Sequence, residues 1–232
     1  MRNKNLICTI CARSGSKGIK NKNLQLINGL TLLEITIIQA KKSKLFSKII
    51  VSSDSKRVLQ IAKNYDVDFV INRSSKLSGD KVSKIDVIKD AVNKTETYFN
   101  FIASSVMDID LTTPLRTVKD IQSAYSLFLK NNFNNLLSVC ESKKNPYFNL
   151  LESKNNKTQL IKRNNIYNSR QVAPKVYEAN SALYIWKRDF LFKASKIIYS
   201  KTGVYIMPRH RSIDIDDKLD LYMVKSIYNK NN

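Results

Sequence analysis

The alternation of strand-like and helix-like segments between residues 6 and 141 is the feature that most limits the fold. Short buried apolar runs predict strands, and apolar residues recurring at every third and fourth position predict helices. The predicted strands are residues 6–12, 48–54, 68–71, 101–110 and 135–141. The helices that separate them are residues 32–44, 55–65, 83–94 and 117–131. Strands connected through helices pair in parallel, with right-handed crossovers and helices on both faces. We therefore expect an α/β fold, a Rossmann-like three-layer sheet of mostly parallel strands.

This rhythm changes after Glu141. Residues 141–180 are polar, rich in asparagine and weakly periodic, which predicts hairpins or a protruding arm instead of another crossover unit. Strand character returns at residues 181–188 and 203–208, and residues 217–229 predict a closing helix. With no internal repeat and no low-complexity linker, we expect residues 1–232 to form a single domain with one insertion.

Composition limits the class of protein. Hydrophobic residues make up 43% of the 232 residues, so the chain can bury a sizeable core. The chain has no apolar stretch of membrane-spanning length and no leader-like start, and its three cysteines cannot all pair, so we expect a cytoplasmic protein without a membrane partner. The net charge of +21 comes from lysines scattered along the chain, without an arginine-rich arm. We therefore expect no nucleic-acid partner, while the basic surface would attract polyanionic substrates such as nucleoside triphosphates.

A polar loop follows the first strand, where α/β proteins bind phosphate. Its sequence, RSGSKGIKNKN (13–23), contains neither a Walker motif nor the GxGxxG fingerprint of dinucleotide-binding folds. Gly15 and Gly18 would let backbone N–H groups approach an anion. Positive charge would come from Arg13, Lys17, Lys20 and Lys22. We interpret the segment as a phosphate-binding loop; the alternative is an ordinary solvated loop.

The tripeptide DID occurs twice, at residues 108–110 and 214–216. Closely spaced carboxylates are hard oxygen ligands suited to Mg²⁺ that bridges phosphates. The alternative is a helix cap, a role open to Asp216 or Asp217. Because ligands of open α/β sheets lie beyond the carboxyl ends of the strands, we expect the opening loop, Asp54 and the pair Asp108/Asp110 to converge on one cleft.

The remaining reactive side chains give weaker signals. Cys8 and Cys11 form a CxxC inside a predicted strand, which favours two small buried residues over a redox or zinc site. His210 is the only histidine, so a site with two or three histidines is impossible within one chain, and a structural role is the default.

Several segments, taken together and in order, resemble the acylneuraminate cytidylyltransferase family. ARSGSKGIKNKN (12–23) is similar to the family's opening pattern A-R-x-G-S-K-G-x-x-x-K-N, and LTTPLR (111–116) to its P-T-S-P-L-R segment. NPY (145–147), RQ (170–171) with Pro174, and NSALYI (180–185) resemble its central segment. SIDIDDKLDL (212–221) resembles its ending.

The resemblance implies a homodimer in which residues 141–180 reach across to the partner subunit, with CTP as nucleotide, a nonulosonic acid as second substrate and Mg²⁺ as cofactor. On matching positions it implies nucleotide contacts from Arg13, Ser14, Gly15, Ser16, Lys17, Asn23, Arg73 and Ser83. It implies sugar contacts from Asp110, Arg170 and Asn180, and metal ligation by Asp214, Asp216 and Asp110. The candidate catalytic residues are Arg13, Lys17, Asp214 and Asp216.

Two positions depart from the family pattern. Lys20 replaces the usual proline of the opening loop, and Asp110 and Leu111 stand where the sialate enzymes usually have glutamine before P-T-S-P-L-R. An aspartate there resembles related sugar cytidylyltransferases, in which it binds metal, and the branch that acts on legionaminic-type sugars. Asp110 is therefore a candidate for both the metal and the sugar.

The implied reaction is attack by the anomeric hydroxyl of the sugar acid on the α-phosphorus of CTP, with pyrophosphate as leaving group. A legionaminic-type sugar is favoured over N-acetylneuraminic acid because of Asp110. Three alternatives remain open: a cytidylyl- or nucleotidylyltransferase for 3-deoxy-manno-octulosonate or a sugar 1-phosphate, a glycosyltransferase that uses DID as its DxD motif, and a non-enzymatic nucleic-acid binder.

Overall fold

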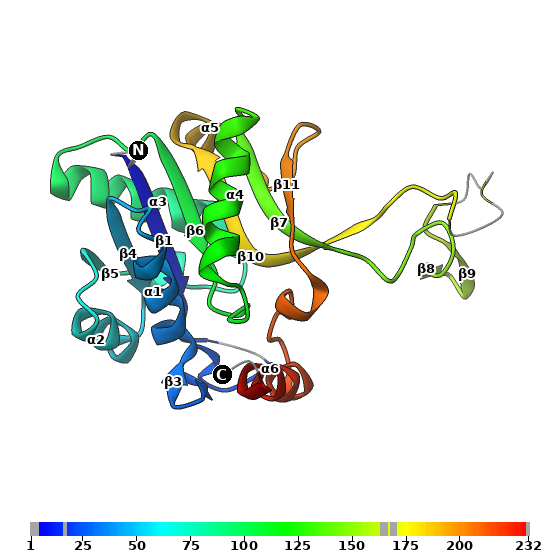
Figure 1. Ribbon diagram of the computed structural model, residues 1–232, viewed down its shortest axis with the longest axis horizontal. Coiled ribbons are helices and arrows are strands. Elements are labelled where there is room, and N and C mark those ends of the chain that lie inside the picture. The colour runs from blue at the N-terminus through cyan, green and yellow to red at the C-terminus, as the bar shows by residue number, and fades with distance from the viewer. Residues whose placement is uncertain (1–4, 16–17, 163–166, 168–170, 231–232) are drawn as a thin grey trace.

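A seven-stranded sheet forms the centre of the molecule (Figure 1). The computed structural model describes residues 5–15, 18–162, 167 and 171–230. The strand order is β11-β7-β10-β6-β1-β4-β5, and β10 alone in this sheet runs antiparallel to its neighbours. The strands are β1 (Leu6–Ala12), β4 (Lys48–Ser53), β5 (Phe69–Asn72), β6 (Ser105–Ile109), β7 (Asn135–Glu141), β10 (Tyr177–Lys187) and β11 (Gly203–Ile206). The expected mostly parallel α/β sheet is confirmed.

The five predicted helices are present. They are α1 (Leu32–Ser43), α2 (Lys56–Asn64), α3 (Lys84–Phe99), α4 (Val118–Lys130) and α6 (Lys218–Lys230). Thr31 and Thr117 begin α1 and α4 with capping boxes, in which the threonine side chain and an acidic residue satisfy each other's backbone N–H groups. The sequence patterns did not predict α5 (Arg188–Lys193) or the three short 3₁₀ helices Lys22–Leu24, Ser75–Leu77 and Arg209–Arg211.

Two apolar cores flank the sheet, one on each face. Successive side chains of a strand point to opposite faces, so Leu6, Cys8 and Ile10 of β1 pack into one core and Ile7 into the other. The first core includes buried residues of α1, α2 and α4, and the second includes those of α3 and α5. Helices on both faces give the three layers that the sequence predicts.

The described part of residues 141–180 extends away from the sheet (Figure 1). Beyond the body of the protein, β7 and β10 continue as an antiparallel ribbon, in which Glu141 pairs with Tyr177 (Figure 1). The end of this ribbon carries the hairpin β8 (Leu151–Lys154) and β9 (Lys157–Leu160). A second small hairpin, β2 (Leu26–Ile27) and β3 (Leu30–Thr31), precedes α1.

The register of the parallel strands fixes the position of the site. Ala12 at the end of β1 pairs with Ser53 of β4, and Ser53 pairs with Asn72 of β5. The segments that follow these three strands, which begin at Arg13, Asp54 and Arg73, therefore emerge at one edge of the sheet. Among the described residues, no helix is both long enough and apolar enough to span a membrane.

Candidate active site

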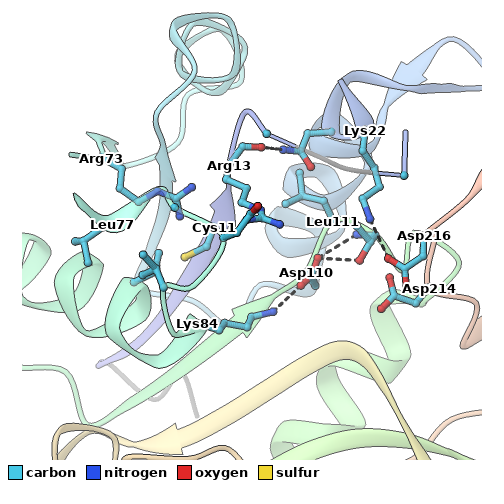
Figure 2. Close-up of a pocket in the computed structure, with 18 residues that line it drawn as sticks. Cys11, Arg13, Lys22, Arg73, Leu77, Lys84, Asp110, Leu111, Asp214 and Asp216 are labelled. Atoms are coloured by element: carbon cyan, nitrogen blue, oxygen red, sulfur yellow. Dashed lines mark hydrogen bonds and ion pairs between the residues drawn. The ribbon is translucent and has the colours of Figure 1, made fainter. Parts of the chain in front are cut away.

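A cleft of about 470 Å³ lies beyond the carboxyl ends of these strands, within the size range of small-molecule sites (Figure 2). Its lining comes from segments far apart in the sequence: Arg13 after β1, Arg73 after β5, Asp110 after β6, and Asp214 and Asp216 before α6. The lining is cationic around the opening loop and anionic around Asp110, Asp214 and Asp216. The cleft therefore suits a ligand that carries both phosphate groups and a metal ion.

Asp54 holds the opening loop in place. Its carboxylate accepts hydrogen bonds from the backbone N–H of Ser14 at 2.7 Å and from the Ser14 hydroxyl at 2.6 Å. Burial alone would raise the pKa of Asp54, but the bonds from Ser14 and the charge of Arg73 outweigh it, so the pKa is lowered. The ionised Asp54 side chain thus anchors the loop. The sequence led us to expect that Asp54 and the loop lie close together, and they are in direct contact.

Arg73 is buried beside this anchor. Its side chain is 4% exposed, and its Nη2 lies 3.7 Å from Asp54 Oδ1. The Nε and Nη2 groups have no hydrogen-bond partner among the described residues. A buried guanidinium with unused donors favours an acceptor group on a bound ligand, because an unsatisfied buried donor is energetically costly.

The opening loop also packs against the segment that carries the second DID. The Lys22 ammonium donates to the carbonyl of Ile215 at 2.7 Å and lies 3.1 Å from Asp216 Oδ1. A Cβ at Gly18 would lie 2.0 Å from the carbonyl oxygen of Asp216, so only glycine permits this approach. Asn23 donates to the carbonyl of Arg13 at 2.8 Å and closes the loop on itself. Two segments from opposite ends of the chain therefore form one wall of the cleft.

Asp214 and Asp216 lie side by side at this wall (Figure 2). Burial raises the pKa of Asp214, and its Oδ1 is buried without a hydrogen-bond partner in the described part of the chain. The N-cap role belongs to Asp217, which accepts from the backbone N–H groups of Leu219 and Asp220, so Asp216 keeps its side chain for the cleft. An orphaned carboxylate oxygen beside a second, exposed carboxylate fits a cation.

The described residues contain no cluster of three or more His, Cys, Asp or Glu side chains arranged to hold a metal ion. Asp110, the third predicted ligand, forms an ion pair with Lys84. Mg²⁺ is typically bound through one or two carboxylates, with substrate phosphates and water as its other ligands. The two carboxylates of Asp214 and Asp216 therefore match the number that a protein typically contributes to such a site.

Asp110 forms an ion pair that the sequence analysis missed. Lys84, in the first turn of α3, places its Nζ 2.5 Å from Asp110 Oδ2 and 3.2 Å from Asp108 Oδ2. Burial would raise the pKa of Asp110, but Lys84 and hydrogen bonds from Thr112 lower it to about 2. No local pattern marks Lys84, because its partners lie on a strand distant in sequence.

Two arginines, Arg116 buried and Arg211 partly exposed, shape the loops around the cleft. Arg116, which belongs to the motif LTTPLR, is 1% exposed and donates to the carbonyls of Asp110 and Thr113 and to the Thr36 hydroxyl. Arg211 pairs with both carboxylate oxygens of Asp120, at 2.9 and 3.0 Å. These arginines hold the turn after β6 and the segment before Asp214, and neither lines the cleft.

Other candidate residues lie in different surroundings. Ser83 is exposed and caps α3 by accepting from the backbone N–H of Ile85. Asn180 is 3% exposed, and its side chain bonds to Ser138, Ser212 and the backbone of Ala182. Its predicted sugar contact stays a prediction, and Ser16, Lys17 and Arg170 lie outside the described residues.

The two cysteines of the CxxC differ in their surroundings. Cys8 is buried as expected, whereas Cys11 is partly exposed and lines the cleft. Both are free thiols, and burial raises the pKa of each. His210 is exposed and does not line the cleft.

Comparison with known proteins gives matches along nearly the whole chain. A family model described as cytidylyltransferase matches residues 7–223. CMP-N,N'-diacetyllegionaminic acid synthase of Campylobacter jejuni and post-translational flagellin modification protein B of Campylobacter coli are each 39% identical, over 98% of this chain and 96% of their own lengths. N-acylneuraminate cytidylyltransferase of Escherichia coli is 30% identical, over 100% of this chain and 54% of its own length.

The fold is also similar to that of solved structures. The structure of CMP:2-keto-3-deoxy-manno-octonic acid synthetase complexed with CTP superposes with a TM-score of 0.70. The match covers 98% of this chain and 100% of the other, at 14% sequence identity, so it bears on the fold alone. Cytidylyltransferases of this type generally use a divalent metal ion.

Proposed function

Because the chain belongs to the cytidylyltransferase family, we propose that it joins CMP from CTP to the anomeric hydroxyl of a nonulosonic acid and releases pyrophosphate. The observation that carries the proposal is the cleft itself, in which a cationic loop faces the carboxylates of Asp214 and Asp216. This arrangement suits the transfer of a phosphoryl-type group, which depends on positioning and charge stabilisation more than on covalent catalysis.

The opening loop would hold the triphosphate. Arg13 and the backbone of Ser14 and Gly15 would contact the phosphates, together with Ser16 and Lys17 of the same loop. Arg13 pairs with Asp80 at 2.6 Å, but both side chains are about half exposed, and such surface pairs are weak enough for a phosphate to compete. Asn23 would support this loop, and Arg73 and Ser83 would lie near the cytosine. The unused donors of Arg73 suit the acceptor atoms of that base.

We propose that the divalent ion is Mg²⁺ and that Asp214 and Asp216 bind it. When bound, the ion would neutralise phosphate charge and acidify the attacking hydroxyl. The orphaned Oδ1 of Asp214 and the exposed carboxylate of Asp216 supply its protein ligands. Lys22 would keep Asp216 beside the opening loop.

The chemistry forms one bond and breaks one bond at phosphorus. The anomeric oxygen of the sugar acid attacks the α-phosphorus of CTP, and the bond from that phosphorus to the bridging oxygen breaks. Pyrophosphate leaves with the electron pair of that bond, and the hydroxyl proton passes to solvent or to a bound water. Arg13 and Lys17 would stabilise the charge that grows on the leaving group. Arg170 would pair with the sugar's carboxylate, where a bidentate guanidinium contact fits best.

A legionaminic-type acid is the sugar we favour. The relative that makes CMP-N,N'-diacetyllegionaminic acid is 39% identical, against 30% for the N-acylneuraminate enzyme. Asp110 supports this choice, because it puts an acceptor-only carboxylate where the sialate pattern has an amide that can also donate. The carboxylate would favour a sugar that presents N–H or O–H groups there.

The arm provides the reason to expect a homodimer. Its exposed apolar side chains include Leu151, Val172 and Tyr177, which are 60%, 63% and 38% exposed. An extended ribbon with apolar residues on its surface gains stability when a second surface covers it. We therefore propose that residues 141–180 pack on a second copy of the chain.

A pyrophosphate-release assay tests this function. The protein is incubated with each of the four ribonucleoside triphosphates and with N,N'-diacetyllegionaminic acid, N-acetylneuraminic acid or 3-deoxy-manno-octulosonate. We expect release with CTP, highest for the legionaminic acid. Release with another nucleotide, or with a sugar 1-phosphate in place of every keto acid, would contradict the proposal. A preference of about tenfold for N-acetylneuraminic acid, about 1.4 kcal/mol of transition-state binding, would contradict the sugar alone.

A further inference from the structure

Lys84 lies between the two carboxylates of the first DID. It comes from the first turn of α3, and its ammonium reaches across to the end of β6 (Figure 2). The proposed chemistry leaves this lysine without a role, although it lines the same cleft as the nucleotide site.

The ammonium is enclosed by fixed groups. It lies 2.5 Å from Asp110 Oδ2, 3.2 Å from Asp108 Oδ2 and 4.4 Å from the centre of the Tyr184 ring. Tyr184 and Asp108 pair across the antiparallel strands β10 and β6, so the sheet itself sets their separation. Lys84 therefore occupies a position that the fold defines on three sides.

Each carboxylate also accepts a hydrogen bond from a neighbouring threonine through its other oxygen. Asp108 is 1% exposed, and its Oδ1 accepts from the Thr9 hydroxyl at 2.7 Å. Its Oδ2 has no hydrogen-bond partner in the described part of the chain and faces Lys84. Asp110 Oδ1 accepts from the backbone N–H and the hydroxyl of Thr112, at 3.2 and 3.0 Å. One oxygen of each carboxylate is thus left for a cation between them.

A positive charge between two neighbouring carboxylates favours their ionised forms, which burial and mutual repulsion both disfavour. A divalent ion or a lysine ammonium can supply that charge. The ammonium is a compact point charge with three donors, and it fits the two oxygens and the ring face that surround it.

We propose that the Lys84 ammonium takes the cation position between Asp108 and Asp110 and so directs the divalent ion to Asp214 and Asp216. Lys84 is then a positioning residue. It holds the Asp110 carboxylate in place within the cleft, and it keeps metal away from this carboxylate. The inference deepens the proposed function, on which it rests for the presence of a metal–nucleotide in the cleft.

Manganese binding to the free, full-length protein tests this inference, because Mn²⁺ prefers the same hard oxygen ligands and is followed by electron paramagnetic resonance. Lys84→Met removes the ammonium and keeps a long unbranched side chain, while Lys84→Arg is the matched control that keeps the charge. We expect Lys84→Met to gain a Mn²⁺ site absent from the natural protein, on the order of tenfold or more tighter than its residual binding. A further Asp108→Asn change should remove the gain, and Lys84→Arg should show none.

Unchanged Mn²⁺ binding in a folded Lys84→Met variant would overturn the inference. If that variant does not fold, single substitutions in the protein that retains Lys84 still test the inference. With CTP present, Asp110→Asn should leave Mn²⁺ binding unchanged, whereas Asp214→Asn should weaken it. An equal loss in both variants would show that Asp110 binds the metal. Pyrophosphate release by the natural protein is scored separately, so failure of the proposed function is distinguishable from failure of this inference.

Discussion

Asp214 and Asp216 belong to one tripeptide but are bound differently by the rest of the protein. Asp214 has a buried oxygen without a partner, while the Asp216 side chain is 78% exposed and pairs with Lys22. Neither caps α6, because Asp217 does so. The Oδ1 of Asp214 and the exposed carboxylate of Asp216 are therefore available to a ligand, which supports the proposal that they bind the metal.

The first prediction concerns this pair. Asp214→Asn and Asp216→Asn should each lower turnover on the order of 10²–10³-fold while the fold is kept, because a charge-stabilising contact is lost. Asp189→Asn, at a side chain that is 83% exposed on α5, is the control and should retain turnover. The measurement is steady-state pyrophosphate release with saturating Mg²⁺. Near-normal turnover of the natural protein in excess EDTA would contradict the assignment.

The second prediction concerns the pH dependence of stability at Asp110. Its pKa is about 2 in the folded protein and about 3.9 in an unfolded chain. Because the folded value is depressed, the ionised carboxylate stabilises the protein above pH of about 4, and this contribution is lost as pH falls towards about 2. The difference in free energy of unfolding between the natural protein and Asp110→Asn should shrink over that range. Urea unfolding followed by circular dichroism measures it, and a constant difference would be the contrary result.

Among the elements, the opening loop and the segment before α6 matter most because they fit together without space for a side chain. Gly18 lies against the carbonyl of Asp216, and Lys22 reaches the carbonyl of Ile215. Asp54 holds the start of the loop from β4. The position of the loop that would bind phosphate therefore depends on the position of the carboxylates that would bind metal.

The third prediction follows from that fit. Gly18→Ala should lower kcat/KM for CTP on the order of 10²-fold, because the new Cβ forces the loop away from Asp216 and misplaces its donors. Gly15→Ala adds the same methyl group where no atom lies within 4 Å, so its cost should be clearly smaller. Steady-state kinetics with varied CTP give the comparison. Equal effects of the two substitutions would rule out packing against Asp216 as the cause.

Local patterns predicted most of the elements. The expected strands at residues 6–12 and 135–141 match β1 and β7 at both ends, because each is a short, mostly buried apolar run. The expected strand at 101–110 was too long, since pairing covers only Ser105–Ile109. The expected helix at 83–94 was too short, because α3 continues to Phe99 and ends where Asn100 adopts a left-handed conformation. Helix ends of this kind depend on a single residue's backbone, which periodicity does not report.

The sequence predicted candidate site residues only where they lie in a recognisable sequence motif. The loop around Arg13 and the pair Asp214/Asp216 were identified by composition and by family resemblance. The ion pair of Lys84 and the contact between Lys22 and Asp216 were not, because each contact joins residues that are far apart in the chain. Arg116 lies within a matched motif but faces inward, so the motif marks a structural role there.

At the scale of the whole molecule, the arm is the feature without a local explanation. It leaves the body as a two-stranded ribbon (Figure 1). Its exposed apolar side chains include Leu151, Val172 and Tyr177. A domain with its own core gains nothing from such a projection unless another surface meets it. The proposed dimer gives the arm that surface.

The fourth prediction concerns assembly. The natural protein should sediment as a dimer at micromolar concentrations. Val172→Asp should raise the dimer dissociation constant on the order of tenfold or more, because a charge would be buried at the contact. Ile198→Asp changes a similarly exposed residue, 60% against 63%, that lies away from the arm, and should leave assembly unchanged. A fully active monomer would show that the arm has another purpose.

The central claim is that this cleft transfers CMP from CTP to a nonulosonic acid, and the most direct measurement identifies the product. The natural protein is incubated with CTP, Mg²⁺ and N,N'-diacetyllegionaminic acid, and the mixture is followed by ³¹P nuclear magnetic resonance and mass spectrometry. The account predicts one new phosphodiester resonance, the mass of the CMP-linked sugar and an equal amount of pyrophosphate. Hydrolysis of CTP without a CMP-linked sugar, or a product that retains the β-phosphate, would contradict it.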